Sequence, residues 1–180
     1  MTSTITRGRL TTLDPEAAAA LLRDACRSRL MPVDTPSASP FLDRTAIERL
    51  LPHRDPFLFV DRIDLLDADS GLIAAAFDLE RSAAVLVGHF PNQPVWPGVL
   101  QVEAIAQAGC VLCAVQRDEP LTDVAATHIL GARFVRPIKP GAPLEIVATG
   151  IEEGLFYTVV GQCLQHGDVC SAAIISAYTP

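Results

Sequence analysis

The sequence predicts an α+β protein in which an antiparallel sheet wraps around one long buried helix. From Pro97 to Val115 almost every residue is apolar or small, and a helix that is apolar all round has to be surrounded by protein. After this segment, three apolar segments meet at short polar turns, which is typical of an antiparallel meander. The apolar face of the sheet has to be covered and the helix has to be enclosed, and a sheet that wraps around the helix meets both requirements.

The chain begins with a predicted helical extension. Asp14 can cap a helix, Pro15 suits its first position, and Glu16 favours the positive end of the helix dipole. This alanine-rich helix is expected to run to about Leu30, and residues 31–40 are expected to form a proline-rich linker. We therefore predict an extension over residues 1–40, acting as a docking or disordered tail without a catalytic role, and a main domain over residues 41–180.

In the main domain, Asp43 is expected to cap a short helix that ends at Pro52. Residues 81–87 lead into a proline-rich loop, and the long helix is expected to start at Pro97 and to end near Asp118. Segments rich in Val, Ile, Leu and Phe predict the strands. Their expected ranges are 57–66, 72–79, 124–135, 144–151, 155–164 and 169–178.

The bulk composition limits the kind of protein. A chain of 180 residues is long enough for one domain with a real core, and a 49% hydrophobic composition suggests that some apolar surface is shared with another subunit. The net charge of −7 argues against a nucleic-acid partner. No uninterrupted apolar run reaches the roughly 18 residues of a membrane span, and the first ten residues lack a secretory pattern. We therefore expect a cytoplasmic protein without a membrane span.

Five cysteines are scattered along the chain, and in a cytoplasmic protein free thiols are the default. Cys110 and Cys113 have the spacing of a redox or zinc pair, but they lie within the apolar helix and lack a second such pair or a nearby histidine. Core packing is the better interpretation of both. We expect no metal and no cofactor.

The most informative stretch runs from Gly88 to Gln107. A loop with three prolines carries His89, and the helix that follows carries Glu103, the only ionisable group of the apolar segment. A charge in such a helix is costly unless it is paired or kept for chemistry. Taken alone, a histidine beside aromatic residues or a single buried glutamate is usually structural, so the interpretation depends on the surrounding motif.

Three blocks supply that motif: residues 51–62, 88–107 and 132–141. With them the chain resembles the β-hydroxyacyl-acyl-carrier-protein dehydratases of type II fatty-acid synthesis, which have a hot-dog fold. The resemblance covers roughly residues 43–178 and leaves the first 40 residues outside. It implies dehydration of (3R)-hydroxyacyl thioesters to trans-2-enoyl thioesters.

The residue types suit this reaction. His89 is a base with the right proton affinity near neutral pH, and Glu103 is the candidate proton donor because an apolar wall favours the protonated form of a carboxyl group. The resemblance assigns the N–H of Gly98, at the positive end of the helix, to the thioester carbonyl oxygen. Phe90 and Trp96 are candidate substrate contacts.

Gln107 lies one helical turn after Glu103 and shares its face, so it is a further candidate for the substrate site, holding the carboxyl group or a water molecule. An equally good interpretation is that its amide satisfies a backbone carbonyl. The resemblance gives His53 a structural role in the turn before the first strand, and His128 is expected only to pack.

The resemblance also implies partners. Arg133, Arg136 and Lys139 cluster in a chain short of positive charge, and acyl carrier proteins are strongly acidic, so we expect these residues to dock a carrier bearing a phosphopantetheine-linked acyl chain. A solvated strand edge protected by charge is a nearly equal alternative. The family implies a homodimer or a trimer of dimers, in which two sheets join edge to edge and His89 of one chain faces Glu103 of the other.

Three features depart from the family pattern: Trp96, where a smaller or more flexible residue is usual, Asp55, where an aromatic residue is frequent, and the N-terminal extension. They favour a specialised pathway such as polyketide or polyene assembly as much as fatty-acid synthesis. The alternatives are a dehydratase that also isomerises the double bond, which Glu103 argues against because that branch has aspartate, and a non-catalytic partner subunit. Thioesterases share the fold but have other catalytic patterns.

Overall fold

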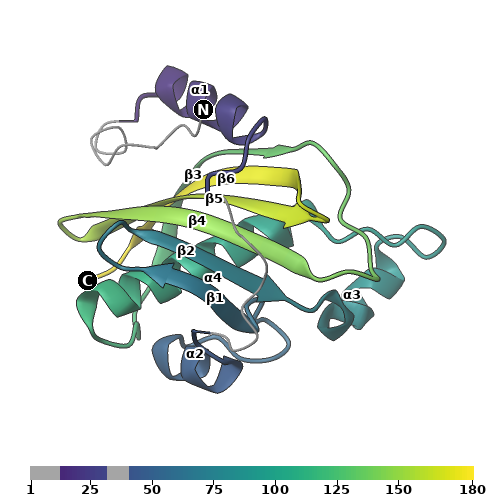
Figure 1. Cartoon of the computed structure of the whole chain (residues 1–180), viewed down its shortest axis with the longest axis horizontal. Helices are drawn as coiled ribbons and strands as arrows, with labels where there is room; N and C mark the ends of the chain where they lie inside the picture. Colours follow the sequence, from purple (N-terminus) through teal and green to yellow (C-terminus); the bar gives the residue numbers. More distant parts are fainter. Residues whose placement is uncertain (1–12, 32–40) are drawn as a thin grey trace.

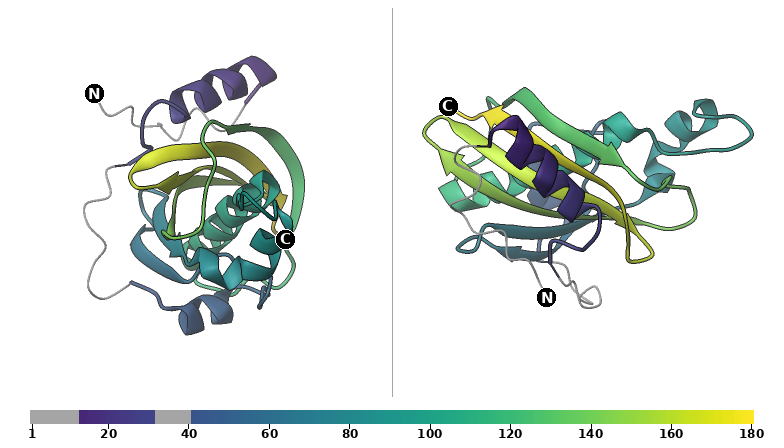
Figure 2. Two further views of the ribbon diagram at one scale, coloured as in Figure 1. Left: turned by 90° about the vertical axis from the view of Figure 1, so that its right-hand side faces the viewer. Right: turned by 90° about the horizontal axis from the view of Figure 1, so that it is seen from above.

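The computed structural model describes residues 13–31 and 41–180, in which a six-stranded sheet curls around a long helix, α4 (Figure 1). The strand order is β1-β2-β4-β5-β6-β3, and every neighbouring pair is antiparallel. Seen from the side in Figure 2, the sheet bends around α4, which confirms the predicted α+β architecture. The strands are β1 (Arg62–Asp67), β2 (Leu72–Phe77), β3 (Ala125–Phe134), β4 (Leu144–Glu153), β5 (Phe156–Gln165) and β6 (Asp168–Tyr178). The helices are α1 (Pro15–Ala25), α2 (Arg44–Leu50), the 3-10 helix η2 (Leu79–Ser82), α3 (Ala83–Gly88) and α4 (Gly98–Arg117).

Helix α4 is the centre of the core. Pro97 is its N-cap residue, and Asp118 ends it in the left-handed conformation. The helix lies very close to the sheet, because a Cβ added to Gly109 would approach Val159 to 2.3 Å and one added to Gly161 would approach Ile105 to 2.4 Å. By length and hydropathy alone α4 could also span a membrane. Its packing against β2, β4, β5 and β6 accounts for that composition as a core helix.

The first strand begins later than the sequence predicts. The expected range is 57–66, but the strand starts at Arg62. Before it, the carbonyl of Phe57 and the N–H of Phe59 bond to the side chain of Gln107 on α4, so they do not join the sheet. The buried side-chain amide of Gln107 takes the place of a neighbouring strand as the hydrogen-bond partner of this backbone. The apolar side chains before Arg62 still fill the core.

Residues 81–87 lead into the proline-rich loop as expected, and they lie in η2 and α3, because Asp78 caps η2 through the N–H of Glu80 and the following alanines favour helix. One other expectation needs correction. Helix α1 ends at Ala25, five residues before Leu30. The fully buried side chain of Gln162 bonds to the carbonyls of Ala25 and Ser28 and to the N–H of Leu30, and so turns the chain there.

Residues 13–31 of the extension are packed against the domain. Helix α1 lies on the outer face of β3 and β6, as Figure 2 shows from above. Its buried side chains form a second apolar cluster with residues of β5 and β6, and the side chain of Leu22 fills the space above Gly131. Cluster members are Ala18, Leu22, Ala25, Val160, Ala172 and Ile174. Residues 13–31 are therefore part of the folded unit, while most of the predicted linker, residues 32–40, lies outside the described residues.

Replacing Leu22 by alanine should lower the free energy of unfolding by about 2–4 kcal/mol, because it empties a buried site between α1 and the sheet. Chemical denaturation measures this change. Arg23→Ala, on the exposed side of the same helix, is the control and should change the free energy by less than about 0.5 kcal/mol. Equal, small effects of both substitutions would mean that α1 does not pack on the sheet.

Candidate active site

His89 lies at the end of α3, where the chain enters the proline-rich loop. Its Nδ1 is 2.8 Å from the carbonyl oxygen of Val95. A carbonyl oxygen only accepts hydrogen bonds, so Nδ1 carries a proton, and in the neutral ring the lone pair is on Nε2. Phe90 stacks on the ring, with centroids 4.2 Å apart. The loop therefore selects the tautomer of the neutral imidazole whose Nε2 can accept a proton.

Beside His89 opens the groove that we call the histidine groove. Gly98, the first residue of α4, lines it, and its N–H has no acceptor inside the helix. The ring of Phe134 lies so close that a Cβ at Gly98 would approach it to 2.8 Å. The helix end therefore brings a backbone donor and a positive dipole to a groove that holds a base. The other lining residues are Val95, Trp96, Val99, Gln101, Val135, Arg136 and Pro137.

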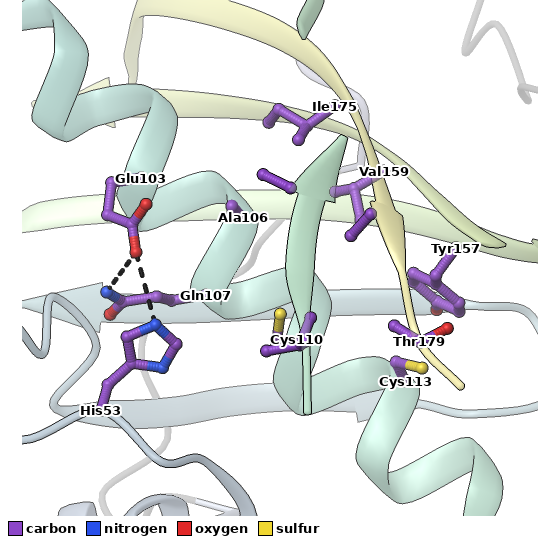
Figure 3. A pocket seen from close by; sticks show the side chains of 13 residues that line it. His53, Glu103, Ala106, Gln107, Cys110, Cys113, Tyr157, Val159, Ile175 and Thr179 are labelled. Atoms are coloured by element: carbon purple, nitrogen blue, oxygen red, sulfur yellow. Dashed lines mark hydrogen bonds and ion pairs between the residues drawn. The ribbon is translucent and has the colours of Figure 1, made fainter. Parts of the chain in front are cut away.

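Glu103 lies in a different pocket, the carboxylate pocket, shown in Figure 3. The side chain of Gln107 donates to its Oε1 at 2.8 Å, and Nε2 of His53 lies 3.6 Å from the same oxygen. The pocket continues from these polar groups along α4 between the helix and the sheet, past mainly apolar side chains. These are Ala106, Cys110, Cys113, Val124, Ala126, Tyr157, Val159, Ile175, Ala177 and Thr179.

Gln107 has only one possible orientation. Its Oε1 accepts from the N–H of Phe59 at 2.7 Å, because an N–H group needs an acceptor. Its Nε2 therefore faces the carbonyl of Phe57 at 2.9 Å and Oε1 of Glu103, and both amide protons are used. Gln107 therefore has both of the expected roles: it bonds to a backbone carbonyl, and it holds the carboxyl group of Glu103.

Within one chain the candidate base and acid do not share a pocket. His89 and Gly98 line the histidine groove, whereas Glu103 lines the carboxylate pocket. The two pockets adjoin opposite ends of β3: Val124 and Ala126 border the carboxylate pocket, and Phe134 and Val135 border the histidine groove.

The other predicted site residues are spread more widely. Phe90 is 56% exposed, whereas Trp96 is fully buried with its ring packed against Phe59 and Phe77, so it fills the core beneath the groove. A direct contact of Trp96 with substrate stays a prediction. Asp55, a departure from the family pattern, forms ion pairs with Arg44 at 2.6 Å and Arg81 at 2.9 Å.

The three candidate docking residues have different surroundings. Arg136 lines the histidine groove and donates to the carbonyl of Val169, and Lys139 is exposed nearby with its backbone bonded to Gln165. Arg133 lies near Cys26, just after α1. Burial raises the pKa of that thiol, and the charge of Arg133 opposes this rise. Arg136 and Lys139 are therefore the better placed for a partner that approaches His89.

Within residues 13–31 and 41–180, no group of three His, Cys, Asp or Glu side chains could hold a metal ion, and all five cysteines are free. Burial raises the pKa of Cys110 to about 12 and that of Cys113 to about 11. Both thiols are thus protonated near neutral pH and poor nucleophiles, which supports core packing over redox chemistry.

Alkylation should reveal this protection. At pH 8 iodoacetamide should leave Cys110 and Cys113 of the folded protein unmodified over an hour, because few thiolates form so far below their pKa. Peptide mass spectrometry, with protein unfolded in guanidinium as the control in which all five cysteines react, measures the difference. Rapid modification of folded Cys110 would contradict the assignment.

One site residue was missed. The resemblance implies a structural role for His53, but this histidine lines the carboxylate pocket beside Glu103. Its position in the first resemblance block was the available signal.

Known proteins are similar to most of this chain. A family model described as FabA-like domain matches residues 51–169, which leaves α1 outside the match. A 3-hydroxyacyl-[acyl-carrier-protein] dehydratase FabZ from Anaeromyxobacter sp. (strain Fw109-5) is 38% identical over 143 residues, covering 76% of this chain and 89% of that protein. The FabZ of Protochlamydia amoebophila (strain UWE25) is 40% identical over 119 residues, covering 66% of this chain and 74% of its own length.

Solved structures support the fold. The dehydratase heterocomplex ApeI:P from Xenorhabdus doucetiae matches with a TM-score of 0.57 at 20% identity, over 74% of this chain and 90% of that one. The TT0310 protein from Thermus thermophilus matches with a TM-score of 0.51 at 15% identity, over 71% of this chain and 100% of that one. The predicted hot-dog fold is confirmed.

Proposed function

Because this chain belongs to the FabA-like domain family, we propose that it dehydrates 3-hydroxyacyl thioesters carried on an acyl carrier protein. The observation that carries the proposal is the pairing of a basic imidazole beside a helix N-terminus with a carboxyl group at the mouth of a mainly apolar pocket. Dehydration needs these three elements: a base, an oxyanion donor and an acid.

The chemical roles follow from the geometry of each group. Nε2 of His89 removes the C2 proton, and the negative charge that develops on the thioester oxygen is stabilised by the N–H of Gly98 and the helix dipole. The carboxyl group of Glu103 protonates the C3 hydroxyl, the C3–O bond breaks, and water leaves as the C2–C3 double bond forms. The proton gained by His89 then returns to Glu103 through solvent, which completes the cycle.

A complete site needs two protomers. Strand β3 is an edge strand, and Ile129, Phe134 and Val135 near it are about half exposed or more. Exposed apolar edges favour pairing with another strand. Antiparallel pairing of β3 with the same strand of a second copy sets the start of one against the end of the other. The carboxylate pocket of one protomer then adjoins the histidine groove of its partner.

Exposed side chains around the histidine groove support the same interface. Val99 is 75% exposed and Phe90 is 56% exposed, which is unfavourable for apolar side chains at a free surface. We infer a homodimer as the functional unit, with a trimer of dimers as the larger assembly implied by the resemblance. His89 of one protomer acts with Glu103 of the other.

The substrate is expected to enter over Arg136 and Lys139, which offer positive charge to an acidic carrier protein. The phosphopantetheine arm crosses the histidine groove, and the acyl chain occupies the apolar length of the carboxylate pocket. The proposed setting is cytoplasmic fatty-acid synthesis or a specialised polyketide or polyene pathway, with no metal or cofactor in the reaction.

Incubation with 3-hydroxyacyl-carrier-protein substrates of several chain lengths tests the function. Intact-protein mass spectrometry should show loss of one water from the carrier-bound acyl group, with a preferred chain length. The Glu103→Gln protein is the control for spontaneous elimination. Unchanged substrates at every chain length would contradict the proposal.

A further inference from the structure

The two oxygens of the Glu103 carboxyl group have different surroundings. Oε1 accepts a hydrogen bond from Nε2 of Gln107, whose orientation is fixed by Phe57 and Phe59, and it also faces His53 (Figure 3). Since Oε1 accepts from a fixed donor, it acts as the carbonyl oxygen of the neutral acid. The acid proton therefore belongs on Oε2, the oxygen left for the substrate.

His53 is the second group directed at Oε1. Its Nε2 lies 3.6 Å from that oxygen, whereas its Nδ1 is buried and has no hydrogen-bond partner. A proton on Nδ1 would be buried without an acceptor, which is costly. Of the two tautomers of the neutral ring, the favoured one therefore carries its proton on Nε2, which faces Glu103.

The backbone around His53 is held from two sides. Gln107 binds Phe57 and Phe59, and Asp55 is tied to Arg44 and Arg81. This anchoring restricts the imidazole to the mouth of the carboxylate pocket. The distance to Glu103 is longer than a direct hydrogen bond, and such contacts in enzymes shorten when the substrate binds.

We propose that His53 is a positioning residue for Glu103: as an Nε2–H donor it joins Gln107 in fixing Oε1, so that the protonated Oε2 faces the C3 hydroxyl. This inference rests on the proposed role of Glu103 as the acid. A proton relay through His53 would need contact of both ring nitrogens with proton carriers, and the buried Nδ1 argues against it.

Three substitutions at His53 separate positioning from packing. In His53→Gln the amide nitrogen occupies nearly the place of Nε2, so this variant should keep kcat within about three-fold of the wild type. In His53→Asn the amide is one carbon shorter and cannot reach Glu103, and in His53→Leu the donor is absent. Both should lower kcat roughly ten-fold, the scale of one lost hydrogen bond, with KM changed less than two-fold.

The measurements are steady-state kinetics with one hydroxyacyl-carrier-protein substrate and thermal unfolding of each variant. Equal loss in all three variants, or a loss in KM alone, would overturn the positioning role and indicate packing or substrate contact. Wild-type kcat in His53→Leu would overturn it as well. Glu103→Gln is assayed in parallel: if that variant stays active, the proposed function itself fails, and the result is distinct from a failure confined to His53.

Discussion

Substitution of His89 by alanine is expected to lower kcat at least about 100-fold, and Glu103→Gln is expected to do the same. The first removes the Nε2 lone pair that accepts the C2 proton. The second keeps the size of the side chain and its contact with Gln107 but removes the proton that the leaving hydroxyl needs. Each loss should appear in both kcat and kcat/KM, because the interactions develop in the transition state.

Matched substitutions at exposed positions control for nonspecific effects. His166→Asn, in the turn between β5 and β6, keeps a residue that tolerates the positive φ there, and Glu153→Gln repeats the charge change at the end of β4. Both should leave kcat within about two-fold. A well-folded His89→Ala protein with near-normal turnover would remove His89 from the mechanism.

The chemistry-bearing stretch was predictable because it is local in sequence. The proline-rich loop, the glycine at the helix start and a single carboxylate in an apolar helix lie within twenty residues. Composition alone indicates that this helix is enclosed, and the structure agrees, with α4 surrounded by four strands of the sheet.

The environment of Glu103 could not be derived in the same way. Gln107 contacts Phe57 and Phe59 across about fifty residues of sequence, and His53 reaches Glu103 across a similar separation. Such contacts depend on how the segment before β1 crosses α4. The same crossing explains why the strand predicted to begin at residue 57 begins at Arg62, since side-chain hydrogen bonds replaced the sheet pairing.

The sequences of β5 and β6 indicate that a second element, α1, packs on the sheet. Residues of β5 and β6 are apolar almost without alternation, and both strands are buried along most of their length. A sheet with one solvated face alternates apolar and polar residues, so continuous apolar strands indicate cover on both faces. In this chain α4 covers one face and α1 covers part of the other.

Mixing two inactive proteins is expected to restore activity. If His89 of one protomer acts with Glu103 of its partner, a dimer of one His89→Ala chain and one Glu103→Gln chain has one intact site and one site that lacks both groups. Random exchange makes about half of the dimers mixed, so about a quarter of all sites should recover. Against separate variants at about 1% of wild-type activity, this is a gain of roughly 25-fold.

The structural reason for this expectation is the separation of the two pockets along β3. Each protomer carries the base and the acid in pockets that share no lining residue, and the pocket that holds the acid extends to the start of that strand. An antiparallel β3 pair is the arrangement that joins them. A site built within one chain would instead leave every site of the mixture with one missing group.

The most direct test of the shared site is therefore this complementation, performed with differently tagged His89→Ala and Glu103→Gln proteins. Mild denaturant is applied and removed to exchange subunits, and the doubly tagged dimers are purified and counted before assay. The shared site predicts that purified mixed dimers have about half of the wild-type activity per dimer, because one of their two sites is intact. Mixed dimers that stay at the level of the separate variants would contradict the account and place both groups in one chain.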